Sequence, residues 1–217
     1  MVSVSADKVM VCSGRMKAFF VNFFLVFLAS SLVAKEEGME ETRYTNYVIT
    51  EKGVGSFGVS KKLPANLSEK DFLEHYFCGY IGDGIPVEGL SLFDGQIRVF
   101  MKSGPFQRKA RSEAVEPKCA SFAPRAFREA KKGVKISMIS VLGAIARTDK
   151  GIAVGATFKA LKEAYPDIAV HPVPSTMGHD ECVATSKSLP NVRFFFESCK
   201  EAQEGGTIVR IDVVTTK

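Results

Sequence analysis

Runs in which β-branched and aromatic residues recur at every second position dominate the chain from residue 47 onward. This period of two is typical of strands with one buried face. It predicts strands at 47–50, 90–93, 96–101, 135–146, 168–173, 182–186, 192–199 and 208–214. Asp94-Gly95 separates two of these runs and predicts a tight hairpin.

Two stretches instead show the spacing of an amphipathic helix. Ser68 is a suitable cap for the first, which we expect to end at Gly79 with Cys78 on its last turn. Thr157 is a suitable cap for the second, whose apolar face includes Leu161. The segment 103–132 contains three prolines and is predicted to be mostly a long loop.

The order of predicted elements repeats. Thr50-Glu51-Lys52-Gly53-Val54 and Thr148-Asp149-Lys150-Gly151-Ile152 are similar, and each precedes a short helix and then strands. The sequence therefore predicts an α+β fold: an antiparallel sheet with short helices packed on one face. We expect one domain over 47–217, built from two units of similar pattern at about 47–135 and 136–217.

The N-terminal segment has the features of a secretory signal peptide. Arg15 and Lys17 precede an apolar run that extends to Ala34, and its unbroken core is shorter than the roughly 20 residues needed to cross a bilayer. We expect cleavage after residue 34, with an uncleaved membrane anchor as the alternative. Translation could start at Met1 or at Met16.

A flexible tether is expected at 35–46, where charged residues lack apolar periodicity. No cysteine follows the apolar run closely, so the expected product is soluble and carries no lipid. We therefore predict a periplasmic or secreted protein.

Four cysteines lie beyond the apolar run, and an even number in an exported chain indicates disulfides. Four cysteines permit three pairings. Cys182 with Cys199 is favoured because both flank a predicted hairpin, and Cys78 with Cys119 then follows by elimination. No Cys-x-x-Cys motif is present, which argues against a redox enzyme.

Positive charge is concentrated in one part of the chain. Residues 35–217 contain 26 basic and 23 acidic residues, too small an excess to indicate nucleic-acid binding. Between residues 98 and 135, however, eleven basic residues are opposed by only three glutamates. This distribution could bind an anionic envelope component or an acidic protein. The candidate residues are Arg108, Lys109, Arg111, Arg125, Arg128, Lys131 and Lys132.

The phenylalanines between these cations would suit an interfacial surface. The simpler alternative is a solvated basic loop whose phenylalanines pack on the core.

The histidines offer the other candidate chemistry. His179 and Asp180 lie in the segment 175–181, eight residues beyond His171. Consecutive residues on one loop rarely converge on one metal ion, so a polar hairpin loop is the simpler interpretation. We predict no metal and no cofactor.

Three stretches resemble the RpoE-regulated lipoprotein family, a Gram-negative envelope domain of unknown function. They are Ile49-Thr50-Glu51-Lys52-Gly53-Val54-Gly55, Asp149-Lys150-Gly151-Ile152-Ala153-Val154-Gly155-Ala156-Thr157-Phe158 and Val209-Arg210-Ile211-Asp212-Val213. The resemblance implies an envelope address and transfers no catalytic residue. Members of that family usually carry a lipidated N-terminal cysteine, and this chain has none after its apolar run.

Together these patterns predict an exported, non-enzymatic binding or structural module of the cell envelope. The alternative is a small secreted hydrolase or inhibitor-like protein that uses the 175–181 loop.

Overall fold

The computed structural model describes residues 47–82, 84–173 and 181–215, all within one compact unit, Tyr44–Lys217. The fold is α+β, as predicted from the sequence. The expected signal segment 1–34 and tether 35–46 lie outside the described residues.

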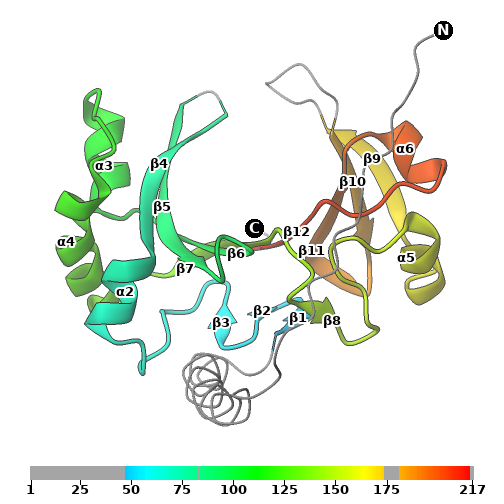
Figure 1. Ribbon diagram of the computed structural model, residues 1–217, viewed down its shortest axis with the longest axis horizontal. Coiled ribbons are helices and arrows are strands. Elements are labelled where there is room, and N and C mark those ends of the chain that lie inside the picture. The colour runs from blue at the N-terminus through cyan, green and yellow to red at the C-terminus, as the bar shows by residue number, and fades with distance from the viewer. Residues whose placement is uncertain (1–46, 83, 174–180, 216–217) are drawn as a thin grey trace, which may run out of the picture. The chain divides into compact units, whose positions relative to one another are not determined.

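An antiparallel sheet of eight strands forms the centre of this unit (Figure 1). Its strands lie in the order β4-β5-β6-β7-β12-β11-β10-β9. Their bounds are β4 Tyr76–Ile81, β5 Ile85–Leu92, β6 Ile97–Met101, β7 Ile136–Val141, β9 Ala169–Val173, β10 Glu181–Ser186, β11 Leu189–Phe196 and β12 Arg210–Val214. Figure 1 shows the hairpins β4–β5 and β9–β10 on opposite sides of the central strands β7 and β12.

The connectivity divides the sheet into two similar halves. Strands β4 to β7 form one four-stranded meander and β9 to β12 form the other. Helix α2 (Glu69–His75) precedes the first meander, and α5 (Phe158–Ala164) precedes the second. Helices also enter between the third and fourth strand of each: α3 (Pro105–Ser112) and α4 (Cys119–Lys132) in the first, α6 (Cys199–Gln203) in the second. The pairing of β7 with β12 joins the halves. By connectivity the first unit therefore ends at Val141, a few residues beyond the expected boundary.

A smaller sheet contains β1 (Val48–Thr50), β2 (Gly53–Val54), β3 (Phe57–Gly58) and β8 (Arg147–Thr148), and β1 and β8 pair in parallel. The two similar motifs noted in the sequence begin at Thr50 and Thr148, the last residues of β1 and β8. In both turns a threonine hydroxyl accepts a backbone hydrogen bond: Thr50 from Lys52 N and Thr148 from Ile152 N, each at 3.2 Å. The donor lies two residues after the threonine in the first turn and four residues after it in the second.

The helices pack on one face of the large sheet. Side chains that lie directly opposite in an antiparallel pair point to the same face. Following the register from Leu90 through Val99, Ile139, Val213 and Val192 therefore traces one face across five strands. All five side chains belong to the main core, together with buried residues of α2, α4, α5 and α6. No described helix contributes to the opposite face, which we call the helix-free face.

Three predicted elements differ in the structure. The segment expected to be mostly a loop, 103–132, forms α3 and α4. Pro105 occupies the first position of α3, where the missing N–H costs nothing. Pro124 lies in the second turn of α4, which continues through it while burying Ala123, Ala126 and Ala130.

Helix α2 also ends earlier than expected. Ser68 caps it as predicted, accepting a hydrogen bond from Asp71 N at 3.0 Å. The helix ends at His75, and Tyr76 to Ile81 pair with β5 as strand β4, so Cys78 lies on a strand. Cys199, expected at the end of a strand, instead begins α6.

None of the helices in the described ranges is both long and apolar enough to cross a membrane.

Candidate functional site

Both expected disulfides are present. Cys78 on β4 is bonded to Cys119 at the start of α4, with 5.3 Å between their Cα atoms. Cys182 on β10 is bonded to Cys199 at the start of α6, with a Cα–Cα distance of 4.8 Å. Each bridge therefore fastens a helix to the same face of the sheet, one in each half.

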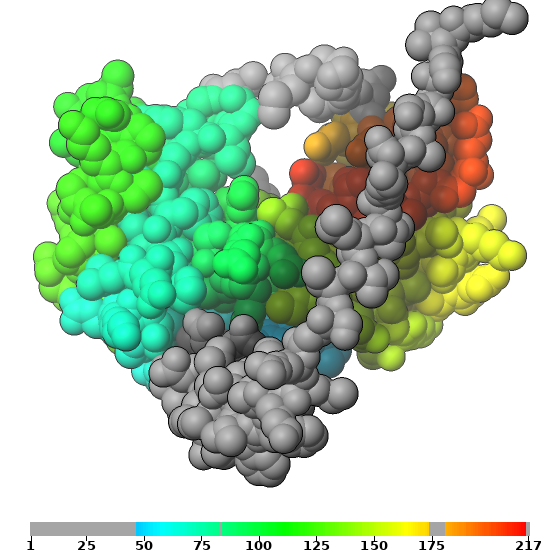
Figure 2. All heavy atoms as spheres, in the orientation of Figure 1, coloured from blue at the N-terminus to red at the C-terminus, as the bar shows by residue number. Residues whose placement is uncertain are grey.

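The seven candidate basic residues all lie on α3 and α4, and all are exposed. Figure 2 shows these two helices (green) as an outer flank of the unit beside β4 and β5. The phenylalanines of this segment turn inward: Phe106 is fully buried, while Phe122 and Phe127 pack partly buried against the core. The simpler expectation for them, packing on the core, is therefore the one observed.

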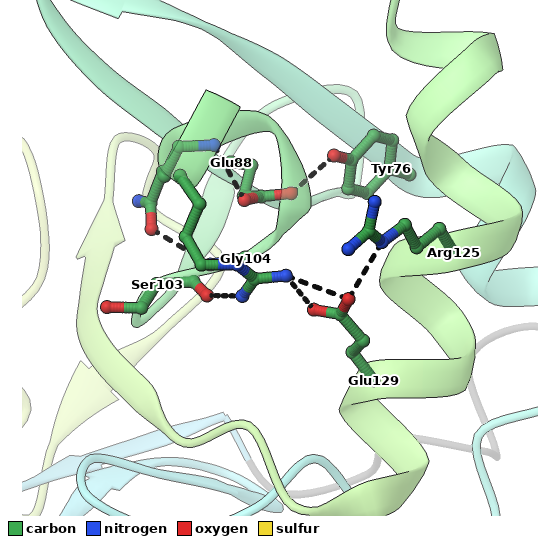
Figure 3. A network of polar contacts seen from close by, with 8 residues as sticks. Tyr76, Glu88, Ser103, Gly104, Arg125 and Glu129 are labelled. Carbon is green, nitrogen blue, oxygen red and sulfur yellow. Dashed lines mark hydrogen bonds and ion pairs between the residues drawn. The ribbon is translucent and has the colours of Figure 1, made fainter. Parts of the chain in front are cut away.

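Some of these cations bind within the molecule. Arg108 donates to both carboxylate oxygens of Glu129, at 2.8 and 2.6 Å, and to the carbonyl of Ser103. Arg125 donates to Glu129 at 3.0 Å (Figure 3). Burial of Glu129 would raise its pKa, but the hydrogen bonds from the two guanidinium groups outweigh that effect and hold the pKa low. Glu129 thus links α3 to α4.

Lys109 and Lys131 also have partners: Lys109 pairs with Glu113 at 3.5 Å. The Lys131 ammonium donates to two backbone carbonyls, those of Ala65 at 3.1 Å and Leu67 at 2.9 Å.

A buried carboxylate supports the start of α3. Glu88, on β5, has no exposed surface. It accepts hydrogen bonds from the Tyr76 hydroxyl at 2.5 Å and from Gln107 N at 3.1 Å (Figure 3). Gly104 caps α3 so closely that a Cβ there would lie 2.0 Å from a Glu88 carboxylate oxygen. The arrangement is a helix cap supplied by a neighbouring strand, and no local sequence signal predicts it, because Glu88 and Gln107 are 19 residues apart.

The histidine candidates do not form a site among the described residues. His171 is exposed on β9, directly opposite Val183 on the helix-free face. His179 and Asp180 lie outside the described residues. No group of three or more His, Cys, Asp or Glu side chains in the described part of the chain could hold a metal ion.

A row of polar side chains crosses the centre of the helix-free face. The register places Arg98, Ser140, Asp212 and Arg193 directly opposite one another on β6, β7, β12 and β11. Both arginines are exposed, and neither forms a hydrogen bond or ion pair with another described residue. Asp212 between them is only 6% exposed.

Arg210, two residues before Asp212, connects this row to acidic and aromatic neighbours. Its guanidinium lies 3.8 Å from the centre of the Phe195 ring. It donates to Glu181 at 3.0 Å and contacts Asp212 at 3.2 Å. Burial raises the pKa of the Asp212 carboxyl, although the charge of Arg210 opposes the shift. Arg210 thus contacts a carboxylate on each of two strands and an aromatic ring.

Apolar side chains flank the polar row. Phe77 and Phe100 meet edge to face, with ring centroids 5.4 Å apart. Beyond them, on the β4–β5 hairpin, Ile81 and Ile85 lie opposite each other and are 42% and 59% exposed. On the other side, Phe195 and Val183 are buried but lie outside the main core. The helix-free face thus combines aliphatic, aromatic and arginine side chains.

Two hollows lie away from the helix-free face. A cavity of about 190 Å³ between α2, α4 and the 62–67 segment is lined mainly by apolar side chains, including Phe72 and Phe127, and by Lys62 and Lys131. The second is lined by three glutamates, Glu197, Glu201 and Glu204. Neither joins His171 to another polar cluster.

Comparison with known proteins gives little further identification. The chain matches no protein-family model and no curated protein. Among solved structures it is similar to a crystal structure described as the uncharacterized protein yfeY from Escherichia coli. The two are 14% identical and superpose with a TM-score of 0.46, over 77% of this chain and 99% of the other. A likeness of this strength carries no argument about function.

Proposed function

We propose that this chain is an exported, non-enzymatic binding module of the cell envelope, and that its helix-free face binds another protein. The observation that carries the proposal is the combination found there. Exposed Ile81 and Ile85 lie on the same face as Arg98, Arg193 and Arg210, whose guanidinium lies over the Phe195 ring.

The composition of this face favours a protein as the partner. Arginine is enriched where proteins bind each other, and Arg210, which contacts Glu181 and the Phe195 ring, loses little entropy on binding. The three arginines are nearly balanced by Glu181 and Asp212. A face so close to neutral has little attraction for nucleic acid or an anionic membrane.

The proposed address is the periplasm or the cell exterior. Two disulfides support an oxidising compartment, since such bonds are rare in the cytosol. The signal-like N-terminus and the resemblance to the RpoE-regulated lipoprotein family support the same address.

Photo-crosslinking in the native envelope tests the proposal. A photoreactive amino acid would replace Ile85, Arg98 or Arg193 on the helix-free face. Matched controls would carry it at Lys159 and Lys162, which are exposed on α5 on the other side of the sheet. We expect one discrete protein adduct from the helix-free positions and none from the controls. Adducts of equal yield from both sides, or none from the helix-free positions, would refute the proposal.

The hydrolase or inhibitor alternative rests on the 175–181 loop. Of that loop only Glu181 is described, and its carboxylate pairs with Arg210. The alternative stays a prediction.

A further inference from the structure

The outer flank formed by α3 and α4 is rich in positive charge. From Pro105 to Lys132 it has eight basic and three acidic residues. All eight cations are exposed, and the two helices are held together by the pairing of Arg108 with Glu129. This ion pair joins the two helices that carry the cations.

The cations differ in whether they already form hydrogen bonds or ion pairs within the molecule. Arg108, Arg125 and Lys131 bind Glu129 or backbone carbonyls within the molecule. The pairs of Lys109 with Glu113 and of Lys118 with Glu116 are exposed on both sides, so water and salt weaken them. Three of the cations contact no other described residue through a hydrogen bond or ion pair: Arg111, Arg128 and Lys132.

The spread of the cations and the inward packing of the phenylalanines favour one class of anionic partner. A single phosphate or a small acid would need a converging cradle of donors, whereas these cations are spread along two helices. A protein partner would need an apolar centre in the interface. The phenylalanines that could form one, Phe106, Phe122 and Phe127, pack inward. What remains is an extended cationic surface, which suits an extended anionic one.

We propose that the α3–α4 flank docks on an anionic phospholipid bilayer, through Arg111, Arg128 and Lys132. Each such residue close to an anionic membrane contributes on the order of 1 kcal/mol, so three can determine adsorption. Because the phenylalanines are turned inward, docking is electrostatic and without insertion, and it weakens as salt screens the charges. The inference is independent of the proposed helix-free binding face.

The test is co-sedimentation of the purified full-length protein with lipid vesicles. One set contains phosphatidylglycerol with phosphatidylcholine, and the other contains phosphatidylcholine alone. The test variant combines Arg111→Glu, Arg128→Glu and Lys132→Glu. The matched control combines Lys159→Glu, Lys162→Glu and Lys200→Glu, which changes the net charge equally on exposed positions of α5 and α6.

We expect the unaltered protein and the control to adsorb to phosphatidylglycerol vesicles at low salt. The flank variant should partition about a hundredfold more weakly. Both variants share the N-terminal segment, so any binding through it cancels in the comparison. If the flank variant unfolds, the triple glutamine variant at the same positions replaces it.

Three outcomes would overturn the inference. One is equal weakening in both variants, which would make net charge alone responsible. Another is failure of the unaltered protein to prefer phosphatidylglycerol vesicles. The third is binding of soluble polyglutamate but not of vesicles, which would identify an acidic protein as the partner.

Discussion

Glu88 experiences opposing influences at the residue scale. Its complete burial disfavours the charged form, whereas the Tyr76 hydroxyl and the α3 backbone N–H groups favour it. Burial dominates, and the pKa of Glu88 is raised above its ordinary value. A carboxyl group whose pKa is higher in the folded state binds its proton more tightly there than in the unfolded chain.

This raised pKa gives a pH dependence with a definite sign. The stability contributed by protonating Glu88 is fully present below the unfolded pKa and is lost as pH rises through the folded pKa. The wild-type protein should therefore gain stability relative to Glu88→Gln, whose side chain does not titrate, as pH falls from about 7 to about 5. Urea unfolding of both proteins at each pH measures the difference. A gain for the variant instead would mean that the hydrogen bonds keep Glu88 ionised.

At the scale of elements, the disulfides fasten helices to strands in both halves of the fold. The bridge between β4 and α4 spans 41 residues of sequence, and the bridge between β10 and α6 spans 17. Closing a longer loop removes more entropy from the unfolded chain. The first bridge is therefore expected to contribute more.

Replacing both cysteines of a bridge by alanine tests this expectation. Cys78→Ala with Cys119→Ala should lower the free energy of unfolding by about 4 kcal/mol, and Cys182→Ala with Cys199→Ala by about 3 kcal/mol. Denaturant unfolding under oxidising conditions measures both losses. A loss of less than about 1 kcal/mol in either case would show that packing, not the bridge, holds that helix.

The same elements show what the sequence could and could not predict. The caps at Ser68 and Thr157 and the Asp94-Gly95 hairpin follow from local signals, and both disulfides follow from the even number of cysteines and their pairing by elimination. Helices α3 and α4 do not follow from such signals, because Pro105 and Pro124 indicate breaks in a helix. A proline ends a helix only where the free-energy cost of its position exceeds the free energy gained by burying the residues beyond it.

At the scale of the whole unit, the helix-free face depends on long-range register. Ser140 lies opposite Asp212, 72 residues further along the chain, and this pairing brings Arg98 and Arg193 to either side of a buried carboxylate. The alternation of single strands predicts an exposed face for each. It gives no order of the strands in the sheet, so the row could not be predicted from sequence.

The two proposed surfaces place different partners on different parts of the fold. The helix-free face is nearly balanced in charge and partly apolar, whereas the α3–α4 flank is cationic with its aromatic residues turned inward. A protein could thus be bound at the sheet while the flank contacts a membrane.

The most direct measurement of the central claim is the affinity of the protein captured by crosslinking for variants of the purified chain. Ile85→Asp and Arg193→Glu alter exposed side chains of the helix-free face, and Lys162→Glu alters an exposed side chain of α5. We expect Ile85→Asp and Arg193→Glu each to weaken binding at least about tenfold, the loss of an interface contact worth about 1.4 kcal/mol, and Lys162→Glu to leave it unchanged. Unchanged affinity in both variants of the helix-free face, with the fold intact, would contradict the account.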